Sequence, residues 1–258
     1  MARRVTKGNI DALCTAHSGD GSWPCRLCAY PQTPAQPPTA DQGVYGARVD
    51  TGPNGQPIEI HAVRPAYLTE RNRRQRVPYN GPDAPGTIVV DPYARFLYYV
   101  LDNGEAMRYG VAVGQAGKNF QGSATIGRKH AWPSWTPTAN MVRTQPELYG
   151  PLKGGLPGGV DNPLGSRALY LYQGGRDTMY RIHGTMDPSS IGKATSAGCI
   201  RLFNQDIMDL FENVPNGTRV KVRTRAESLA LEGPLVELPN GYLAPAGEVQ
   251  TAAAQPAQ

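Results

Sequence analysis

The run Thr195-Ser196-Ala197-Gly198-Cys199-Ile200-Arg201-Leu202 is the most informative part of the sequence, because it places a cysteine directly before an apolar strand. A second run, Tyr180-Arg181-Ile182-His183-Gly184-Thr185, places a histidine at the end of another strand, sixteen positions before Cys199. A thiol and an imidazole at the polar ends of apolar strands have the composition of a nucleophile–base pair. The alternative is a buried apolar cysteine and a structural histidine, since cysteine is among the most often buried residues.

The residues around the thiol supply the other groups that acyl transfer requires. Cys199 would act as a thiolate, with His183 as its imidazolium partner and base. The backbone N–H groups of Gly198 and Cys199 would form an oxyanion hole. Arg201 lies two residues beyond the thiol, on the same strand face, where a fixed cation would bind a substrate carboxylate. Ser196 would donate a hydrogen bond to the substrate or brace the loop.

Together, the two runs and Ile191-Gly192 between them resemble the signature of the YkuD-type L,D-transpeptidases, the ErfK/YbiS group. The likeness extends over roughly Gly86 to Arg223. Further matches in order and spacing are Trp132-Pro133-Ser134-Trp135-Thr136-Pro137, Gly158-Gly159-Val160-Asp161-Asn162-Pro163-Leu164-Gly165, Asn204, Asp206, Leu210 and Val214-Pro215-Asn216-Gly217-Thr218-Arg219-Val220.

One position departs from that family, because Ala197 stands where the family's Ser-His-Gly-Cys motif has a histidine. His183, which matches the base of the family, is retained. The departure therefore concerns substrate positioning and pH dependence near the thiol, and the minimal Cys199–His183 pair survives it.

The resemblance implies a mainly β fold, a β-sandwich-like catalytic domain with short helices. It implies that Cys199 attacks the third residue of a peptidoglycan tetrapeptide stem, that D-alanine leaves with a proton from His183, and that a thioester remains. A side-chain amine of a second stem then forms a 3→3 cross-link. Gly184 and Trp132 are expected to bind substrate. The same likeness implies peptidoglycan stem peptides as partners, no metal or organic cofactor, carbapenems as reagents for the thiol, and the periplasm or cell envelope as the location.

Other functions remain open at this point. Water as acceptor would make the protein an L,D-carboxypeptidase, and a protein lysine would make it a ligase that anchors outer-membrane protein to the wall. A non-catalytic wall-binding module is the alternative from another class. A zinc-containing nucleic-acid binder is a further one, although no nucleic acid is expected as partner.

Composition favours strands and turns over helices, since the 258 residues include 30 glycines and 24 prolines. The net charge of +5 would favour binding to an anionic polymer, or it would only keep the protein soluble. No apolar run reaches the roughly 18–20 residues of a membrane helix, and the sequence as it stands begins without a recognisable secretory signal.

Four segments are predicted: a poorly structured Pro-rich extension (1–57), a basic arm that packs on the catalytic domain (58–85), the catalytic domain (86–224) and a mobile Ala/Pro-rich tail (225–258). Within the domain, Asp102-Asn103-Gly104 predicts a hairpin turn. Apolar residues at helical spacing from Ile207 to Val214 predict a helix capped by Asn204.

Weaker patterns concern the N-terminal half. Cys14, His17, Cys25 and Cys28 have the spacing of zinc ligands, but few apolar residues surround them, so a disulfide or no fixed structure is favoured. The basic cluster comprises Arg71, Arg73, Arg74 and Arg76, and a solvated face is favoured over a nucleic-acid site. His130, close to Trp132, is a candidate for the cleft or an ordinary surface histidine.

Overall fold

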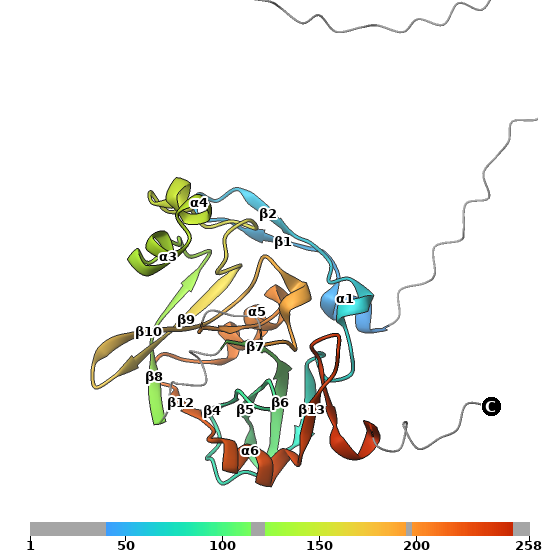
Figure 1. Cartoon of the computed structure of the whole chain (residues 1–258). Helices are drawn as coiled ribbons and strands as arrows, with labels where there is room; N and C mark the ends of the chain where they lie inside the picture. The colour runs from blue at the N-terminus through green and yellow to red at the C-terminus, as the bar shows by residue number, and fades with distance from the viewer. Residues whose placement is uncertain (1–39, 115–121, 195–197, 250–258) are drawn as a thin grey trace, which may run out of the picture. The chain divides into compact units, whose positions relative to one another are not determined.

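The computed structural model describes residues 40–114, 122–194 and 198–249 (Figure 1). Within these residues ten strands form one mixed sheet in the order β3-β6-β5-β4-β12-β8-β9-β10-β11-β7. Their bounds are β3 (Gln75–Pro78), β4 (Ile88–Asp91), β5 (Phe96–Val100), β6 (Glu105–Gly110), β7 (Ala112–Val113), β8 (Gly122–Ala131), β9 (Arg167–Gln173), β10 (Arg176–His183), β11 (Ile200–Arg201) and β12 (Arg219–Val222).

Two hairpins and several short helices surround the sheet. The hairpins pair β1 (Arg48–Thr51) with β2 (Pro57–Ile60), and β13 (Leu235–Glu237) with β14 (Leu243–Pro245). The α-helices are α1 (Ala40–Tyr45), α3 (Ala139–Thr144), α4 (Pro146–Tyr149), α5 (Asn204–Asn213) and α6 (Arg225–Glu232). Single 3-10 turns lie at Pro65–Tyr67, Asp102–Gly104, Gly150–Leu152 and Pro188–Ser190. The prediction of a mainly β fold with short helices is confirmed.

The strands follow the sequence pattern closely in the first half of the domain. β4 is buried along its whole length, as its apolar run Ile88-Val89-Val90 requires for a strand covered on both faces. The predicted hairpin joins β5 to β6 as an antiparallel pair. At its turn Asn103 and Gly104 have φ values of 63° and 72°, the left-handed conformation that favours Asn-Gly.

One apolar core lies between α5 and the sheet. Ile207, Leu210 and Val214 of the predicted helix are fully buried, as their helical spacing indicates. They meet the inward-facing side chains of the sheet, among them Ile88, Leu97, Ile126, Leu169, Ile182, Ile200 and Val220. This core contains side chains from β4 and β5 as well as from β8 to β11, so both halves of the sheet bury one face against it.

The structure differs from the predicted segment boundaries at both ends. Residues 40–57, assigned to the poorly structured extension, contain α1 and β1, and residues 225–245, assigned to the tail, contain α6 and the β13–β14 hairpin. α1 is ordered by tertiary contacts: Tyr45 is 3% exposed, and the Gln205 side chain donates hydrogen bonds to backbone oxygens of Gly46 and His61 at 3.3 and 3.0 Å. Such contacts have no local sequence pattern. The four positions Cys14, His17, Cys25 and Cys28 lie outside the described residues.

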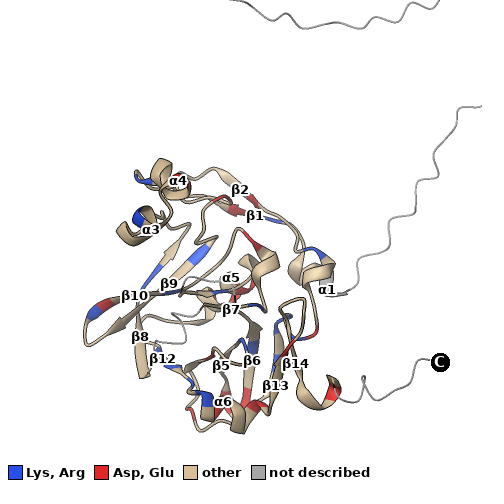
Figure 2. Cartoon of the chain, viewed as in Figure 1, with Lys and Arg blue, Asp and Glu red and all other residues tan. Residues whose placement is uncertain are grey.

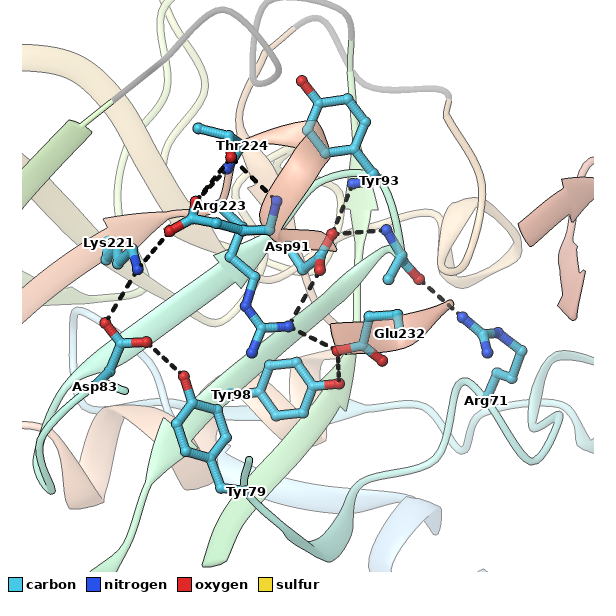
Figure 3. Close-up of polar contacts among 12 residues, drawn as sticks. Arg71, Tyr79, Asp83, Asp91, Tyr93, Tyr98, Lys221, Arg223, Thr224 and Glu232 are labelled. Carbon is cyan, nitrogen blue, oxygen red and sulfur yellow. Dashed lines mark hydrogen bonds and ion pairs between the residues drawn. The ribbon is translucent and has the colours of Figure 1, made fainter. Parts of the chain in front are cut away.

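A buried ionic network joins α6 to the sheet (Figure 3). The Arg223 guanidinium, whose side chain is 3% exposed, donates to Asp91 at 3.2 Å and to Glu232 of α6 at 2.7 Å. Asp91 also accepts backbone N–H groups of Tyr93 and Ala94, at 3.0 and 2.8 Å. Because these charges are removed from water, each depends on its partner. Burial by itself lowers the pKa of Arg223, but hydrogen bonds and neighbouring carboxylates outweigh it and raise the pKa.

Arg223→Met is expected to destabilise the protein by about 3–5 kcal/mol, because the substitution leaves the fully buried Asp91 carboxylate without its cation. Urea unfolding followed by circular dichroism measures the loss. Arg219→Met, at an exposed position of strand β12, which ends one residue before Arg223, is the matched control and is expected to change stability by less than about 0.5 kcal/mol. Equal, small losses in both variants would contradict this role of Arg223.

Candidate active site

The parallel pairing of β10 with β11 brings the histidine and cysteine runs together. Ile182 is opposite Ile200 and His183 is opposite Arg201, so Cys199, one residue earlier, lies beside Arg181. Side chains alternate between the two faces of a sheet, and paired residues share a face. Ile182 and Ile200 point into the core, where they are 0% and 4% exposed. The side chains of Arg181, His183, Cys199 and Arg201 therefore share the opposite face.

His183 is buried and its ring is held in one orientation. Its Nδ1 lies 2.7 Å from the carbonyl oxygen of Gly184, which can only accept, so Nδ1 carries the proton. Burial, and then the charges of Arg201 and Arg181, lower the pKa of His183 to about 4, although carbonyl groups of Gly184 and Leu164 act in the opposite direction. The imidazole is therefore neutral at neutral pH.

Cys199 is half-buried and lies directly before β11. Burial raises the pKa of its thiol, while a backbone hydrogen bond from Arg181 and the charges of Arg181 and Arg201 lower it. The balance is a raised pKa, which favours the thiol over the thiolate. The shifts of both pKa values thus favour the uncharged thiol and imidazole over the thiolate–imidazolium pair that the sequence predicts.

Asn204 fixes the turn that follows His183. Its Oδ1 accepts the backbone N–H groups of Ser166 and Thr185 at 3.0 and 3.3 Å, and its Nδ2 donates to the carbonyl of Thr185 at 3.0 Å. A Cβ at Gly184 would lie 2.2 Å from this Oδ1, so the clamp requires a glycine there. Asn204 was predicted to cap α5, but it is the first helical residue and its side chain faces the turn. Phe203 occupies the N-cap position.

The predicted site residues have different environments. Gly198 has a φ of 148°, within the region that favours glycine, and it is buried. Arg201 is half-buried, and among ion pairs between described residues none includes it. Its charge is thus available on the face of the candidate pair. Ser196 and Ala197 lie outside the described residues.

Trp132 does not have the environment predicted for a substrate-binding residue. Its ring is 2% exposed and packs with Ile60 and Met208, and its indole N–H donates to Asp50 at 2.8 Å. Asp50 also pairs with Arg167 at 2.7 Å. The indole therefore joins the β1–β2 hairpin to the domain. The prediction had no means of finding Asp50, which lies 82 positions away in the sequence.

His130 lies on the same sheet face as the candidate pair. It is opposite Ala168 of β9, which is in turn opposite His183. His130 is exposed, and the small side chain of Ala168 stands between the two imidazoles. His130 is therefore a surface histidine close to the site, and its Nδ1 lies 2.7 Å from the carbonyl oxygen of Ala131.

The basic cluster of the arm makes contacts within the protein. Arg74 pairs with Asp209 at 2.7 Å, Arg76 pairs with Glu105 at 2.9 Å, and Arg71 lies over the Phe96 ring. Figure 2 shows basic and acidic segments close together on several elements, including the β9–β10 hairpin. Only Arg76 is exposed, whereas Arg74 is 17% exposed in its side chain, so the predicted solvated face is wrong for most of the cluster, which packs against the domain.

Among the described residues, no group of three or more His, Cys, Asp and Glu side chains has the arrangement of a metal site. In the same part of the chain no helix is long and apolar enough to cross a membrane.

Residues 85–222 match the family model of the YkuD L,D-transpeptidase catalytic domain. The chain belongs to this family. A probable L,D-transpeptidase ErfK/SrfK of Escherichia coli K12 is 40% identical over 139 residues, which are 53% of this chain and 43% of the relative. A probable L,D-transpeptidase ErfK/SrfK of Salmonella typhimurium is 33% identical over 215 residues, 80% of this chain and 68% of the relative.

A crystal structure from Brucella melitensis, described as a probable carnitine operon oxidoreductase caia, is 50% identical and covers 60% of this chain and 96% of that chain, with a TM-score of 0.43. The chain spans less than half the length of the E. coli relative. Residues 40–84 and 223–249, which contain α1, the β1–β2 hairpin, α6 and the β13–β14 hairpin, lie outside the family model.

Asn204→Ala is expected to reduce stability by about 1–3 kcal/mol and activity by a larger factor than stability explains, because buried backbone groups of Ser166 and Thr185 lose their partner beside His183. Thermal unfolding and turnover measure the two effects. Asn213→Ala is the matched control, since its Nδ2 donates to a backbone oxygen at the exposed end of the same helix. A turnover loss no greater for Asn204→Ala than for Asn213→Ala would contradict the clamp.

Proposed function

We propose that this protein is a cysteine-dependent L,D-transpeptidase of the cell envelope that forms 3→3 cross-links between peptidoglycan stem peptides. The observation that supports it best is the parallel β10–β11 register, which puts His183 and Cys199 on one sheet face beside Arg201. Family membership supplies the reaction class. Stem peptides as substrates and a periplasmic location are part of the proposal.

Acylation begins from the neutral pair. The Cys199 thiol gives its proton to the unprotonated nitrogen of His183 as the sulfur attacks the carbonyl carbon of the third stem residue. The bond from that carbon to the nitrogen of the terminal D-alanine then breaks, and the leaving amine takes the proton from His183. A thioester on Cys199 remains.

Deacylation repeats these proton transfers in reverse. The side-chain amine of a second stem gives a proton to His183 and attacks the thioester carbon, the carbon–sulfur bond breaks, and the sulfur takes the proton back. The lowered pKa of His183 suits the acid step, because a weakly basic imidazole becomes a strongly acidic imidazolium that readily protonates a leaving amine.

Backbone N–H groups of Gly198 and Cys199 are the proposed oxyanion hole, for which the positive φ of Gly198 supplies an uncommon local conformation. Arg201 is proposed to bind a carboxylate of the stem, since its guanidinium is on the same face as the thiol and a fixed cation recognises carboxylates. Gly184 and Ser196 are proposed to line the same site.

Cys199→Ala and His183→Asn are expected to reduce turnover of tetrapeptide-bearing muropeptides by at least about 10³-fold, because each removes a group that moves in every proton or acyl transfer. Mass spectrometry of the muropeptides, with and without an acceptor stem, measures D-alanine release and 3→3 product together.

Retention of 3→3 product by Cys199→Ala would contradict the proposal. D-alanine release without cross-links, even with acceptor present, would replace transpeptidation by hydrolysis while keeping the same two residues. His130→Asn, on the same sheet face but exposed, is the control variant and is expected to remain within about threefold of the parent.

A further inference from the structure

A row of side chains crosses the sheet toward the thiol. Arg128 of β8 is opposite Tyr170 of β9, and Tyr170 is opposite Arg181 of β10. Paired residues of neighbouring strands share a face, so the row continues to Cys199, which lies beside Arg181 just before β11. Arg181 thus stands between an aromatic ring and the proposed nucleophile.

The guanidinium of Arg181 is held by an ion pair and by an aromatic ring. Its two terminal nitrogens donate to the two carboxylate oxygens of Asp177 at 2.7 and 2.9 Å, a bidentate arrangement. It lies over the Tyr170 ring, 4.3 Å from the centroid, and Arg128 lies over the same ring at 3.9 Å. The Arg181 side chain is only 11% exposed.

Local backbone geometry fixes Asp177 as well. The pairing of β9 with β10 shifts register between Asp177 and Arg181, and Met179 inside this bulge has a φ of 63°. Asp177 accepts the backbone N–H of Met179 at 2.8 Å. The bulge therefore presents the carboxylate to Arg181, four residues along the strand, and a fixed ion pair results.

We propose that Arg181, held by Asp177 and Tyr170, is a positioning residue that stabilises negative charge on the Cys199 sulfur as the thiol gives up its proton. The proposal rests on the proposed function of Cys199 as nucleophile. Arg181 acts on the sulfur through its charge and through its backbone N–H, and it is not itself required to touch substrate.

Among the residues that the structure describes, three charged or titratable side chains on β10 and β11 share the face of the thiol. β10 contributes Arg181 and His183, and β11 contributes Arg201, while the described residues of β7, which pairs with β11, are Ala112 and Val113. Tyr170, Arg128 and Asp177 complete the row. Both arginines of β10 and β11 lower the pKa of the thiol against the effect of burial, and both also lower the pKa of His183. Asp177 opposes the charge of Arg181, so the ion pair sets how strongly Arg181 acts.

The test is the pH dependence of Cys199 alkylation by iodoacetamide in the full chain, followed on the Cys199-containing peptide by mass spectrometry. Only the thiolate reacts, so the midpoint reports the ionisation of the thiol. Arg181→Met, which keeps the apolar stem and removes the charge, is expected to raise the midpoint by about half to one pH unit. At a fixed pH below the midpoint, the alkylation rate of Cys199 in Arg181→Met is therefore expected to be about three- to tenfold lower than in the parent.

Three further variants identify the cause of the shift. Asp177→Asn keeps the shape of the pair and removes the opposing charge, so the midpoint is expected to fall. Arg128→Met, which removes the other cation over the Tyr170 ring, is the matched control and is expected to leave the midpoint unchanged. Arg181→Lys, which restores the charge without the bidentate geometry, is expected to recover part of the shift.

An unchanged midpoint in folded Arg181→Met, or an equal shift in Arg128→Met, would overturn the proposal. If Arg181→Met does not fold, Asp177→Asn decides: a lower midpoint supports the role of Arg181 and an unchanged one overturns it. Muropeptide turnover separates this result from the proposed function. If the parent turns over muropeptides but Arg181→Met shows no midpoint shift, only the proposed role of Arg181 is overturned. If Arg181→Met shows the shift but the parent does not turn over muropeptides, the transpeptidase assignment is overturned.

Discussion

The candidate site depends on a parallel ladder of two residue pairs, Ile182 with Ile200 and His183 with Arg201. Because side chains alternate along a strand, the isoleucines that fix this register in the core also determine that His183 and Cys199 point to the other face. A slip of one residue would turn the thiol into the core. The apolar packing of α5 against the sheet thus maintains the geometry of the polar site.

The electrostatics of the site favour a pair that is neutral at rest. Burial disfavours charge on both groups, and the neighbouring arginines disfavour an imidazolium while they favour a thiolate. In the proposed mechanism, a proton transfer that occurs only during attack avoids a standing charge pair. The same low basicity suits the proposed return of the proton from the imidazole to a leaving amine.

Much of this arrangement could be predicted from the sequence because its signals are local. The apolar run of β4, the Asn103-Gly104 turn and the helical spacing of Ile207, Leu210 and Val214 each identify their element without reference to distant residues. The Cys199 and His183 runs were identified in the same way. The structure adds their shared face, which follows from register.

The remainder depends on contacts between distant residues. The family resemblance of its run predicts Trp132 as a substrate-binding residue, and no local signal points to Asp50, its hydrogen-bond partner. Asn204 fits the pattern of a helix cap, yet its side chain clamps backbone from two other segments. Arg181 lies in a run that the prediction used only for its histidine, and the proposed role of Arg181 depends on the bulge at Met179 and on Tyr170 from another strand.

The most direct test of the account is to trap the acyl-enzyme. The protein is incubated with a tetrapeptide-bearing muropeptide without acceptor, quenched in acid, digested and analysed by mass spectrometry. We predict a mass increase equal to the donor minus its terminal D-alanine, on the peptide that contains Cys199. Release of D-alanine with no adduct on that peptide, or an adduct on Cys14, Cys25 or Cys28 instead, would contradict the account.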